Sequence, residues 1–236
     1  MNSIHPSAQI IGDVRLGEGN MIGPLVVIIG PVSIGSNNWI GTGAVIGAPP
    51  EVRDWKHPSD AESLSSGGGI EIGEGNVIRE YVQVHQGWHD VTRVGSDTFI
   101  MNRVYVAHDC QVEDGATIAG GALLAGHVRV GRTANVGLGA SVHQRRYVAD
   151  GAMIGMGSVV TRDVPPFAKA YGNPARVRGV NRIGMQRSGI SDAAIDALAA
   201  AYSEPEGARD LAGLEADPDL ASALGSWRQY STSSTA

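Results

Sequence analysis

Aliphatic residues recur at every sixth position along most of this chain. Eight such positions run without a miss from Ile4 to Ile46. The same spacing returns from Ile72 to Val84 and again from Val94 to Val160, which gives 23 positions in all. An amphipathic helix would repeat near every 3.6 residues and a simple strand every second residue, so neither element explains this period.

A period of six predicts short strands joined by tight turns. Glycine often follows the aliphatic residue, as in Ile34-Gly35, Ile40-Gly41 and Ile154-Gly155. Each hexad then forms one flat side of a three-sided coil of about 18 residues, with coils stacked about 4.8 Å apart. The aliphatic residue points inward. The sequence therefore predicts an all-β fold, a parallel β-helix of hexapeptide repeats with about seven or eight coils.

Two insertions interrupt the period, at residues 47–71 and 85–93. The first is polar and rich in Pro, Ser and Gly, and the second contains Trp and two His. If each insertion counts as one corner, five aliphatic residues lie three hexads apart and stack in one column: Ile46, Val84, Val106, Leu124 and Val142. We therefore expect both insertions to leave the coil from the same column.

Four of the seven histidines follow residues of that column by one to three positions: His85, His108, His127 and His143. A single turn histidine is more often structural than functional. Four of them beside both insertions indicate a site along one edge. A regular prism has no deep pocket of its own, so we expect a neighbouring copy to supply the second wall, which favours a homotrimer.

The repeat predicts three regions: a β-helix over residues 1–166, an exit segment over 167–190 and a helical region over 191–236. The turn Asp163–Phe167 is expected to end the β-helix. Ser191 is a candidate N-cap. Ile195, Leu198 and Tyr202 then form an apolar stripe at helical spacing.

Composition narrows the class of protein. Aromatic residues make up only 5% of the chain, as expected where short strands pack on small and aliphatic side chains. One cysteine, Cys110, excludes an intramolecular disulfide or a zinc finger and is expected to be a small buried residue. No signal peptide and no membrane span are visible, so a cytoplasmic location is expected. A net charge of −6 argues against a nucleic-acid partner.

Three coil segments carry a more specific motif. They read Val106-Ala107-His108-Asp109-Cys110, then Leu124-Ala125-Gly126-His127-Val128, then Val142-His143-Gln144. Gly172-Asn173 leads on to Gly179-Val180-Asn181. With the repeats and the C-terminal helices, these segments resemble the UDP-N-acetylglucosamine O-acyltransferase family of lipid A biosynthesis. The resemblance implies that the β-helix is left-handed.

The resemblance also implies a reaction, the transfer of a hydroxyacyl chain from acyl carrier protein to the 3-hydroxyl of the sugar. The co-substrate is a phosphopantetheine thioester, and neither a cofactor nor a metal is expected. By this resemblance His108 is the general base, Asp109 its supporting partner and the Gly126 N–H the oxyanion donor. Histidine suits the role because its ordinary pKa lies near working pH.

Other positions match the family's substrate contacts. The resemblance assigns substrate binding to Asp54, Lys56, His85, His127, His143, Gln144, Asn181 and Arg187. Met156 matches the position that measures the acyl chain. A methionine there, in place of glycine, should block the groove and select a shorter chain.

Three positions differ from the residues usual in the family, and all three concern recognition of the acceptor. Tyr105 stands where histidine is usual, Ile183 replaces a glutamate, and Ser188 replaces one of two paired arginines. The first insertion is also longer than usual. The alternative is therefore the same chemistry on another nucleotide sugar or a specialised metabolite, with acyl-CoA as a possible donor.

Two further function classes share this fold. A metal-dependent hydratase like the γ-class carbonic anhydrases would use interface histidines, but their His-x4-His pair is absent from the coils. His85 and His89 are four apart, but they sit in an insertion. A non-catalytic scaffold would not need histidines aligned with both insertions.

The negative charge is confined to the end of the chain. Up to Ile190 there are 16 basic and 16 acidic residues, whereas from Ser191 onward two arginines face eight acids. An acidic tail should repel an acidic carrier protein. The basic candidates for carrier docking precede the tail: Arg145, Arg146, Arg176, Arg178, Arg182 and Arg187.

Overall fold

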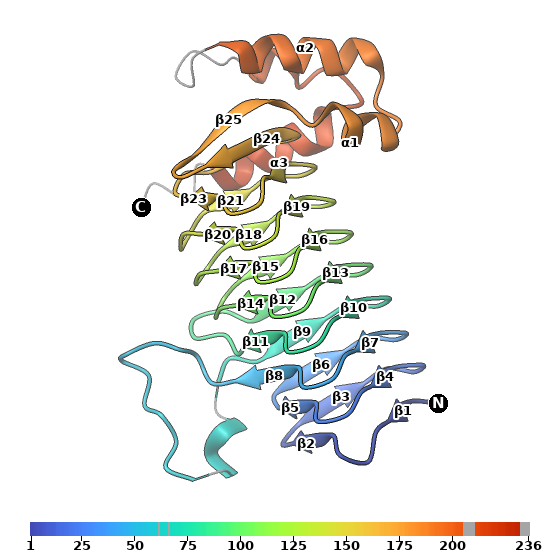
Figure 1. The fold of residues 1–236 in the computed structure, drawn as a ribbon, viewed down its shortest axis with the longest axis vertical. Helices are drawn as coiled ribbons and strands as arrows, with labels where there is room; N and C mark the ends of the chain where they lie inside the picture. The colour runs from blue at the N-terminus through green and yellow to red at the C-terminus, as the bar shows by residue number, and fades with distance from the viewer. Residues whose placement is uncertain (61, 66, 205–210, 232–236) are drawn as a thin grey trace.

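The computed structural model describes residues 1–60, 62–65, 67–204 and 211–231. The chain forms a parallel β-helix of three sheets with a helical region at its C-terminal end (Figure 1). The N-terminus lies at the opposite end of the prism.

The three sheets are named here by letter. Sheet A contains, in order, β1 (Ser3–Ile4), β4 (Met21–Ile22), β7 (Trp39–Ile40), β10 (Val77–Ile78), β13 (Phe99–Ile100), β16 (Thr117–Ile118), β19 (Asn135–Val136), β22 (Met153–Ile154), β24 (Ala168–Gly172) and β25 (Ala175–Val180). Sheet B contains β2 (Gln9–Ile11), β5 (Val27–Ile29), β8 (Val45–Ala48), β11 (Gln83–His85), β14 (Tyr105–Val106), β17 (Leu123–Leu124), β20 (Ser141–Val142) and β23 (Val159–Val160). Sheet C contains β3 (Val14–Leu16), β6 (Val32–Ile34), β9 (Ile70–Ile72), β12 (Thr92–Val94), β15 (Gln111–Val112), β18 (Arg129–Val130) and β21 (Tyr147–Val148).

The register confirms the predicted column. In sheet B, Ile46 pairs with Val84 and Val84 with Val106. Val106 pairs with Leu124 and Leu124 with Val142, an offset of 18 residues per coil. Both insertions leave from sheet B, after β8 and β11, and rejoin at sheet C, at β9 and β12.

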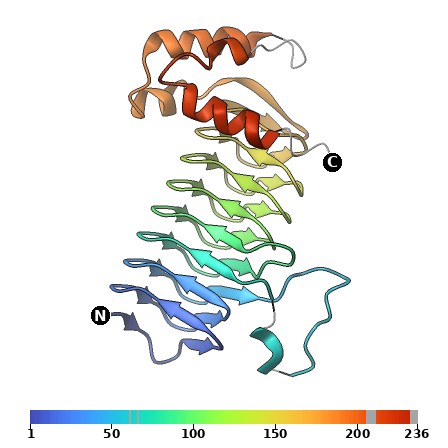
Figure 2. The same ribbon diagram turned by 180° about the vertical axis from the view of Figure 1, so that it is seen from behind.

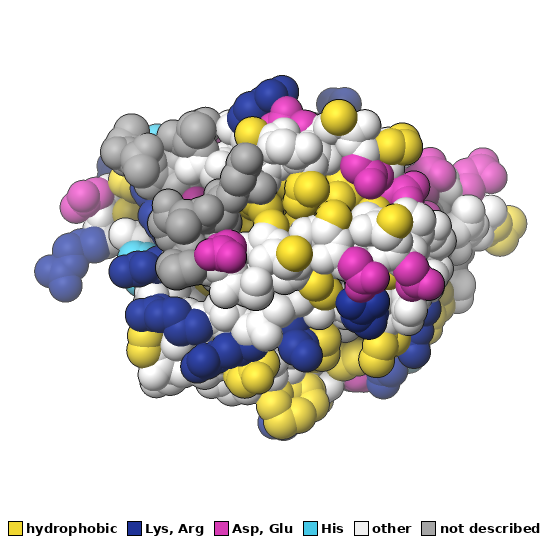
Figure 3. All heavy atoms as spheres, turned by 90° about the horizontal axis from the view of Figure 1, so that it is seen from above, with side chains coloured by type: hydrophobic (Ala, Val, Ile, Leu, Met, Phe, Trp, Pro, Cys, Tyr) yellow, Lys and Arg dark blue, Asp and Glu magenta, His cyan; other side chains and the backbone are white. Residues whose placement is uncertain are grey.

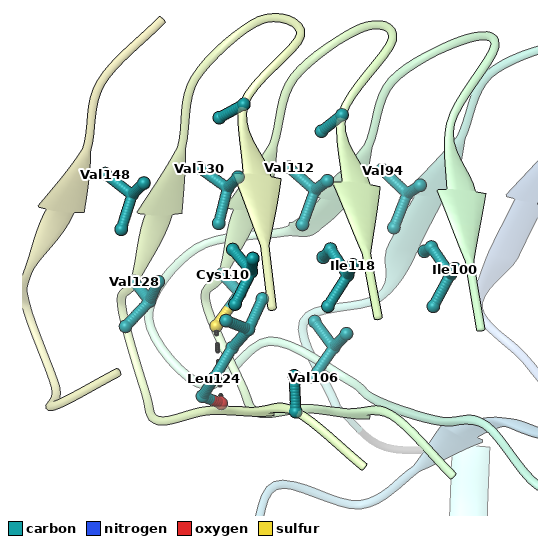
Figure 4. Close-up of a cluster of buried hydrophobic side chains, with 14 of the residues drawn as sticks. Val94, Ile100, Val106, Cys110, Val112, Ile118, Leu124, Val128, Val130 and Val148 are labelled. Carbon is teal, nitrogen blue, oxygen red and sulfur yellow. Dashed lines mark hydrogen bonds between the residues drawn. The ribbon is translucent and has the colours of Figure 1, made fainter. Parts of the chain in front are cut away.

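The interior is a stack of aliphatic side chains (Figure 4). Inward residues are buried from the second coil onward, whereas Ile4 and Ile10 stay 42% exposed because no coil packs beneath them. Cys110 is fully buried, and its thiol lies 3.2 Å from the Ala125 carbonyl oxygen. Burial raises the pKa of this thiol to about 12. The expectation of a small buried residue is therefore confirmed.

Buried polar side chains form a ladder along one corner of the prism. Asn38 Nδ2 donates to Asn20 Oδ1 at 3.0 Å, and Asn76 Nδ2 donates to Asn38 Oδ1 at 2.9 Å. Thr98 Oγ1 then donates to Asn76 Oδ1 at 2.7 Å. Each acceptor oxygen also receives a backbone N–H from the next coil. The ladder thus satisfies polar groups that burial would otherwise penalise.

Sheet A gains one more strand beyond the turn Asp163–Phe167, where the sequence predicts the end of the β-helix. Strand β24 continues sheet A beside β22, and only then does β25 turn back antiparallel. Ile154 pairs with Ala170, an offset of 16 residues, and the inward positions are alanines. The shortened coil and the small side chains together remove the six-residue signal.

Three α-helices and two short 3-10 helices complete the described chain: α1 (Arg182–Arg187), α2 (Asp192–Ser203), α3 (Ala221–Ser231), η1 (Glu62–Ser65) and η3 (Ala212–Leu214). The Ser191 side chain accepts the Ala194 N–H, which confirms the predicted cap. The stripe Ile195, Leu198 and Tyr202 is buried as expected. No helix in the described ranges is long and apolar enough to cross a membrane.

The asparagine ladder yields a stability prediction. We expect Asn38→Ala to lower the free energy of unfolding by about 1–3 kcal/mol, because it leaves buried donors of neighbouring coils without acceptors. Chemical denaturation measures the change. Asn102→Ala, at an exposed turn position, is the matched control. Equal losses in the two variants would contradict this role of the ladder.

Candidate active site

The 18-residue register assembles a cluster from two consecutive turns between sheets B and C. His108 and Gly126 occupy the same position in these turns, and Asp109 and His127 occupy the next one. Asp109 and His127 both have φ of +60°, the left-handed conformation that the turn requires. Residues 18 apart in sequence are therefore stacked neighbours in the site.

Asp109 connects the base to the second insertion. Its Oδ2 lies 2.8 Å from His108 Nδ1, and its Oδ1 accepts the backbone N–H groups of Trp88, His89 and Asp90 at 2.7–3.0 Å. Burial would raise the pKa of this carboxyl, but the hydrogen bonds from His108 and the three N–H groups outweigh burial and lower it. Asp109 therefore stays ionised and acts as a fixed acceptor.

His108 is oriented by this acceptor. With Nδ1 donating to Asp109, the Nε2 lone pair is left to take a proton. A Cβ at position 126 would lie 2.5 Å from His108 Nε2, so only glycine fits there. In the part of the chain that the structure describes, the Gly126 N–H has no hydrogen-bond partner. The site thus places a potential base beside an unused backbone donor.

His127 completes the cluster. Its ring lies edge-on to His108, with centroids 5.1 Å apart, and its Nε2 is 3.5 Å from Asp109 Oδ2. Burial lowers the pKa of His127, and the nearby Arg145 guanidinium lowers it further against the opposing charge of Asp109. His127 is therefore neutral near pH 7, and its Nε2 also lies 3.5 Å from Arg145 Nη2.

A second cluster adjoins the first through Glu51, which the sequence did not single out. Its Oε2 lies 3.0 Å from His85 Nδ1, and its Oε1 accepts the His108 N–H at 3.4 Å. The Tyr105 hydroxyl also hydrogen-bonds to this carboxylate. Tyr105, which stands where histidine is usual in the family, thus donates to Glu51. This replacement was the one feature of the sequence that pointed to the Glu51–His85 pair.

The charges of this second cluster are coupled. Burial would raise the pKa of Glu51, but hydrogen bonds from His85 and Tyr105 lower it to about 2. Burial would likewise lower the pKa of His85, but Glu51 and the Pro49 carbonyl raise it. Glu51 and His85 therefore form an ion pair at the base of the first insertion.

An apolar groove of about 540 Å³ runs along the outward face of sheet B. It is lined by Tyr105, Leu123, Ala125, Ser141, Val142, His143 and Val159. His143 thus faces the groove, and Gln144 is exposed in the same turn. Met156 is 74% exposed in the turn that precedes β23, close in sequence to Val159 but outside the lining.

The remaining predicted site residues lie apart from the histidines within one chain. Asp54 and Lys56 are exposed on the first insertion, which projects from the prism in both views (Figures 1 and 2). Arg187 is the last residue of α1, a helix that lies at the C-terminal end of the prism (Figure 1). Asn181 caps α1 by accepting the Gly184 N–H and also donates to the Gly151 carbonyl, so its contacts in this chain are structural.

Comparisons with known proteins agree on one family. A family model described as UDP-N-acetylglucosamine O-acyltransferase, domain 2, matches residues 163–204, and a bacterial transferase hexapeptide model matches residues 92–126. LpxA from Acinetobacter baumannii is 30% identical, with a TM-score of 0.72 over 99% of this chain and 94% of that one. LpxA from Bacteroides fragilis is 28% identical, with a TM-score of 0.80 over 96% and 95%.

The chain belongs to the UDP-N-acetylglucosamine O-acyltransferase family. A curated member from Thiobacillus denitrificans, acyl-[acyl-carrier-protein]--UDP-N-acetylglucosamine O-acyltransferase, is 42% identical over 148 residues, 61% of this chain and 57% of that protein. The chain thus matches just over half the length of such curated relatives. The residues that the hexapeptide model matches include His108, Asp109 and Gly126.

The Glu51–His85 pair yields a prediction for the pH dependence of stability. Its full contribution is expected between pH 4.5 and pH 6.5, the ordinary pKa values of the two groups. It is lost at lower pH as Glu51 protonates near its folded pKa of about 2, and at higher pH as His85 loses its proton. Glu51→Gln should therefore be most destabilising within that window.

Histidine NMR titration measures the pair directly. In Glu51→Gln the pKa of His85 should fall, because burial then acts without the opposing charge. Glu71→Gln is the control, since Glu71 forms an exposed pair with Arg93. An unchanged His85 titration in Glu51→Gln would show that the two groups are not coupled.

Proposed function

We propose that this protein moves a (3-hydroxy)acyl chain from the thioester of an acyl carrier protein to a hydroxyl of UDP-N-acetylglucosamine or a related nucleotide sugar. The observation that carries the proposal is the His108–Asp109 pair, with Nε2 placed against Gly126. The names of the relatives supply the substrate class. We place the reaction in the cytoplasm.

The proposed mechanism is general-base acyl transfer. His108 Nε2 takes the proton of the acceptor hydroxyl as its oxygen attacks the thioester carbonyl carbon. The negative charge that develops on the carbonyl oxygen accepts a hydrogen bond from the Gly126 N–H. The tetrahedral intermediate then collapses, the C–S bond breaks, and His108 returns the proton to the leaving thiolate. Asp109 holds the imidazole in place and stabilises its protonated form.

The acceptor needs a second wall, which we assign to another copy of the chain. Asp54 and Lys56 lie on an insertion that projects away from its own prism. A homotrimer would place such an insertion, and Arg187 and Asn181, beside a neighbour's histidines. His85, His127, His143 and Gln144 line the same edge of the prism and are assigned to substrate contact on that basis.

The donor is proposed to dock at the C-terminal end. Lys and Arg side chains form a row along one edge of that end, apart from many of the acidic side chains (Figure 3). Arg182 pairs with Asp196 at 2.6 Å and Arg146 with Asp163 at 3.4 Å, so these two are partly committed within the chain. Arg145, Arg176, Arg178 and Arg187 form no ion pair with an acid among the described residues, and we propose them as the main carrier contacts. In the acidic tail, Glu206, Arg209 and Asp210 lie outside the described residues.

Tyr105, Ile183 and Ser188 differ from the residues usual in the family, so we also consider a related acceptor. Another nucleotide sugar or a specialised metabolite, with acyl-CoA as donor, would use the same base and oxyanion donor. An assay that offers both donors and several acceptors distinguishes these substrates. Transfer only to an acceptor other than a UDP-sugar would overturn the lipid A assignment and leave the acyltransferase class intact.

One observation favours a second candidate, a metallohydratase. Ligand atoms of His108, Asp109 and His127 all lie within 4.8 Å of one another, a separation that suits a metal ion. Against it, the 2.8 Å between His108 Nδ1 and Asp109 Oδ2 is a hydrogen-bond length with a proton between the atoms. A metal assay on the purified protein decides: one stoichiometric zinc per site would favour the hydratase.

The base is tested by His108→Ala. We expect the variant to fold and to lose turnover by about a hundredfold or more, because the group proposed to take the hydroxyl proton is removed. Acyl transfer to UDP-N-acetylglucosamine measures the effect. His5→Ala, in the exposed first coil, is the control. Full activity of His108→Ala would remove His108 from its role and reopen the scaffold alternative.

The acyl-chain hypothesis is tested by Met156→Gly. We expect the preference among acyl donors of graded length to shift toward longer chains, because the exposed methionine in the turn before Val159, which lines the groove, is removed. Met153→Ala, on the outward face of β22, is the control. An unchanged chain-length preference would contradict the hypothesis.

A further inference from the structure

The tip of the second insertion, residues 87–90, is fixed against the base. Asp109 Oδ1 accepts three consecutive N–H groups of the tip, from Trp88 at 2.9 Å, His89 at 3.0 Å and Asp90 at 2.7 Å. A Cβ at Gly87 would lie 1.6 Å from the Asp90 carbonyl oxygen, so the turn admits only glycine there. The tip is therefore ordered before any ligand arrives, which lowers the entropic cost of binding to it.

This ordered tip presents two aromatic rings to the site. Trp88 and His89 contact each other with their rings tilted by 33° and their centroids 3.9 Å apart. Trp88 meets His108 edge to face at 6.1 Å, and His89 lies nearly parallel to His127 at 6.2 Å. The four rings form a continuous surface around the proposed base.

Packing of the coils does not account for these two rings. The interior of the β-helix is aliphatic, and neither Trp88 nor His89 belongs to it. Trp88 is half-buried and His89 is exposed. An indole held at the surface beside a general base offers an apolar face to whatever binds there.

The position of the tip indicates which of the two substrates it contacts, the acyl donor or the acceptor. The apolar groove on sheet B suits an acyl chain, and it runs from Tyr105 toward the C-terminal end. The tip comes from the coil before His108, whereas Gly126 comes from the coil after it. The acceptor must approach within about 3 Å of His108 Nε2 to lose its proton. The sugar ring that carries the reacting hydroxyl is then the part of the acceptor nearest to Trp88.

We propose that Trp88, supported by His89, is a specificity-determining residue that packs against the sugar ring of the acceptor nucleotide sugar. The apolar C–H face of a pyranose fits an indole, and the neighbouring His89 ring packs against that indole. This assignment rests on the proposed function, since it names a contact of the same acceptor. In this assignment the second insertion forms part of the acceptor site.

The experiment compares Trp88→Ala with Trp88→Phe. Trp88→Ala should raise the Kd and the KM for UDP-N-acetylglucosamine about tenfold. The KM for the acyl donor should not change, and Trp88→Phe should restore most of the affinity. Trp39→Phe is the control, because Trp39 lies on sheet A against Arg79. A Trp88 that merely supports His108 would instead lower kcat and leave the acceptor Kd unchanged.

Tryptophan fluorescence provides a readout that does not depend on turnover. Addition of UDP-N-acetylglucosamine should change the emission of the unsubstituted protein and of Trp39→Phe. The change should be clearly smaller in Trp88→Phe, where only the other tryptophans, among them Trp55 between Asp54 and Lys56, can respond. If the unsubstituted protein binds UDP-N-acetylglucosamine and the Trp88 variants bind it equally well, the inference fails and the proposed function stands. If the unsubstituted protein binds no UDP-sugar, the proposed acceptor fails, and the inference fails with it.

Discussion

Parallel hydrogen bonding between successive coils is the constraint on which the rest of this structure depends. It fixes an offset of 18 residues between stacked positions, so residues distant in sequence become neighbours at known places. The same stacking of coils aligns the aliphatic core and sets His108 beside Gly126, and it carries the asparagine ladder across the insertions, where the offsets are 38 and 22 residues. A site built on such coils inherits their rigidity, which suits a reaction that needs a base and an oxyanion donor in fixed relation.

Asp109 is the fixed acceptor that orients the His108 imidazole on these coils. A buried carboxylate is costly unless hydrogen bonds compensate for the lost water. Here one oxygen receives three backbone N–H groups and the other faces His108, so compensation and function use the same contacts. The insertion tip therefore orders the carboxylate, and the carboxylate orders the imidazole. Glu51 plays a comparable part for the first insertion, through His85 and the backbone of His108.

The coils were predictable from sequence because each carries the same signal. The column from Ile46 to Val142, the burial of Cys110 and the cap at Ser191 all follow from period or from local chemistry. The insertions carry no period, so the contacts of Glu51, Trp88 and His89 depend on backbone N–H directions that no side-chain pattern encodes. Strand β24 was missed for a related reason: its coil is two residues shorter, and alanines replace the aliphatic residues.

The central claim is that Asp109 fixes His108 with Nδ1 as the donor, which leaves Nε2 as the base. Nitrogen-15 NMR of the histidine-labelled protein, at a pH where His108 is neutral, reads the position of that proton directly. The account predicts the Nδ1–H tautomer for His108 in the unsubstituted protein. In Asp109→Ala, Nδ1–H should no longer be the single tautomer of His108. An Nε2–H tautomer in the unsubstituted protein would contradict the account, because the nitrogen beside Gly126 could then not accept a proton.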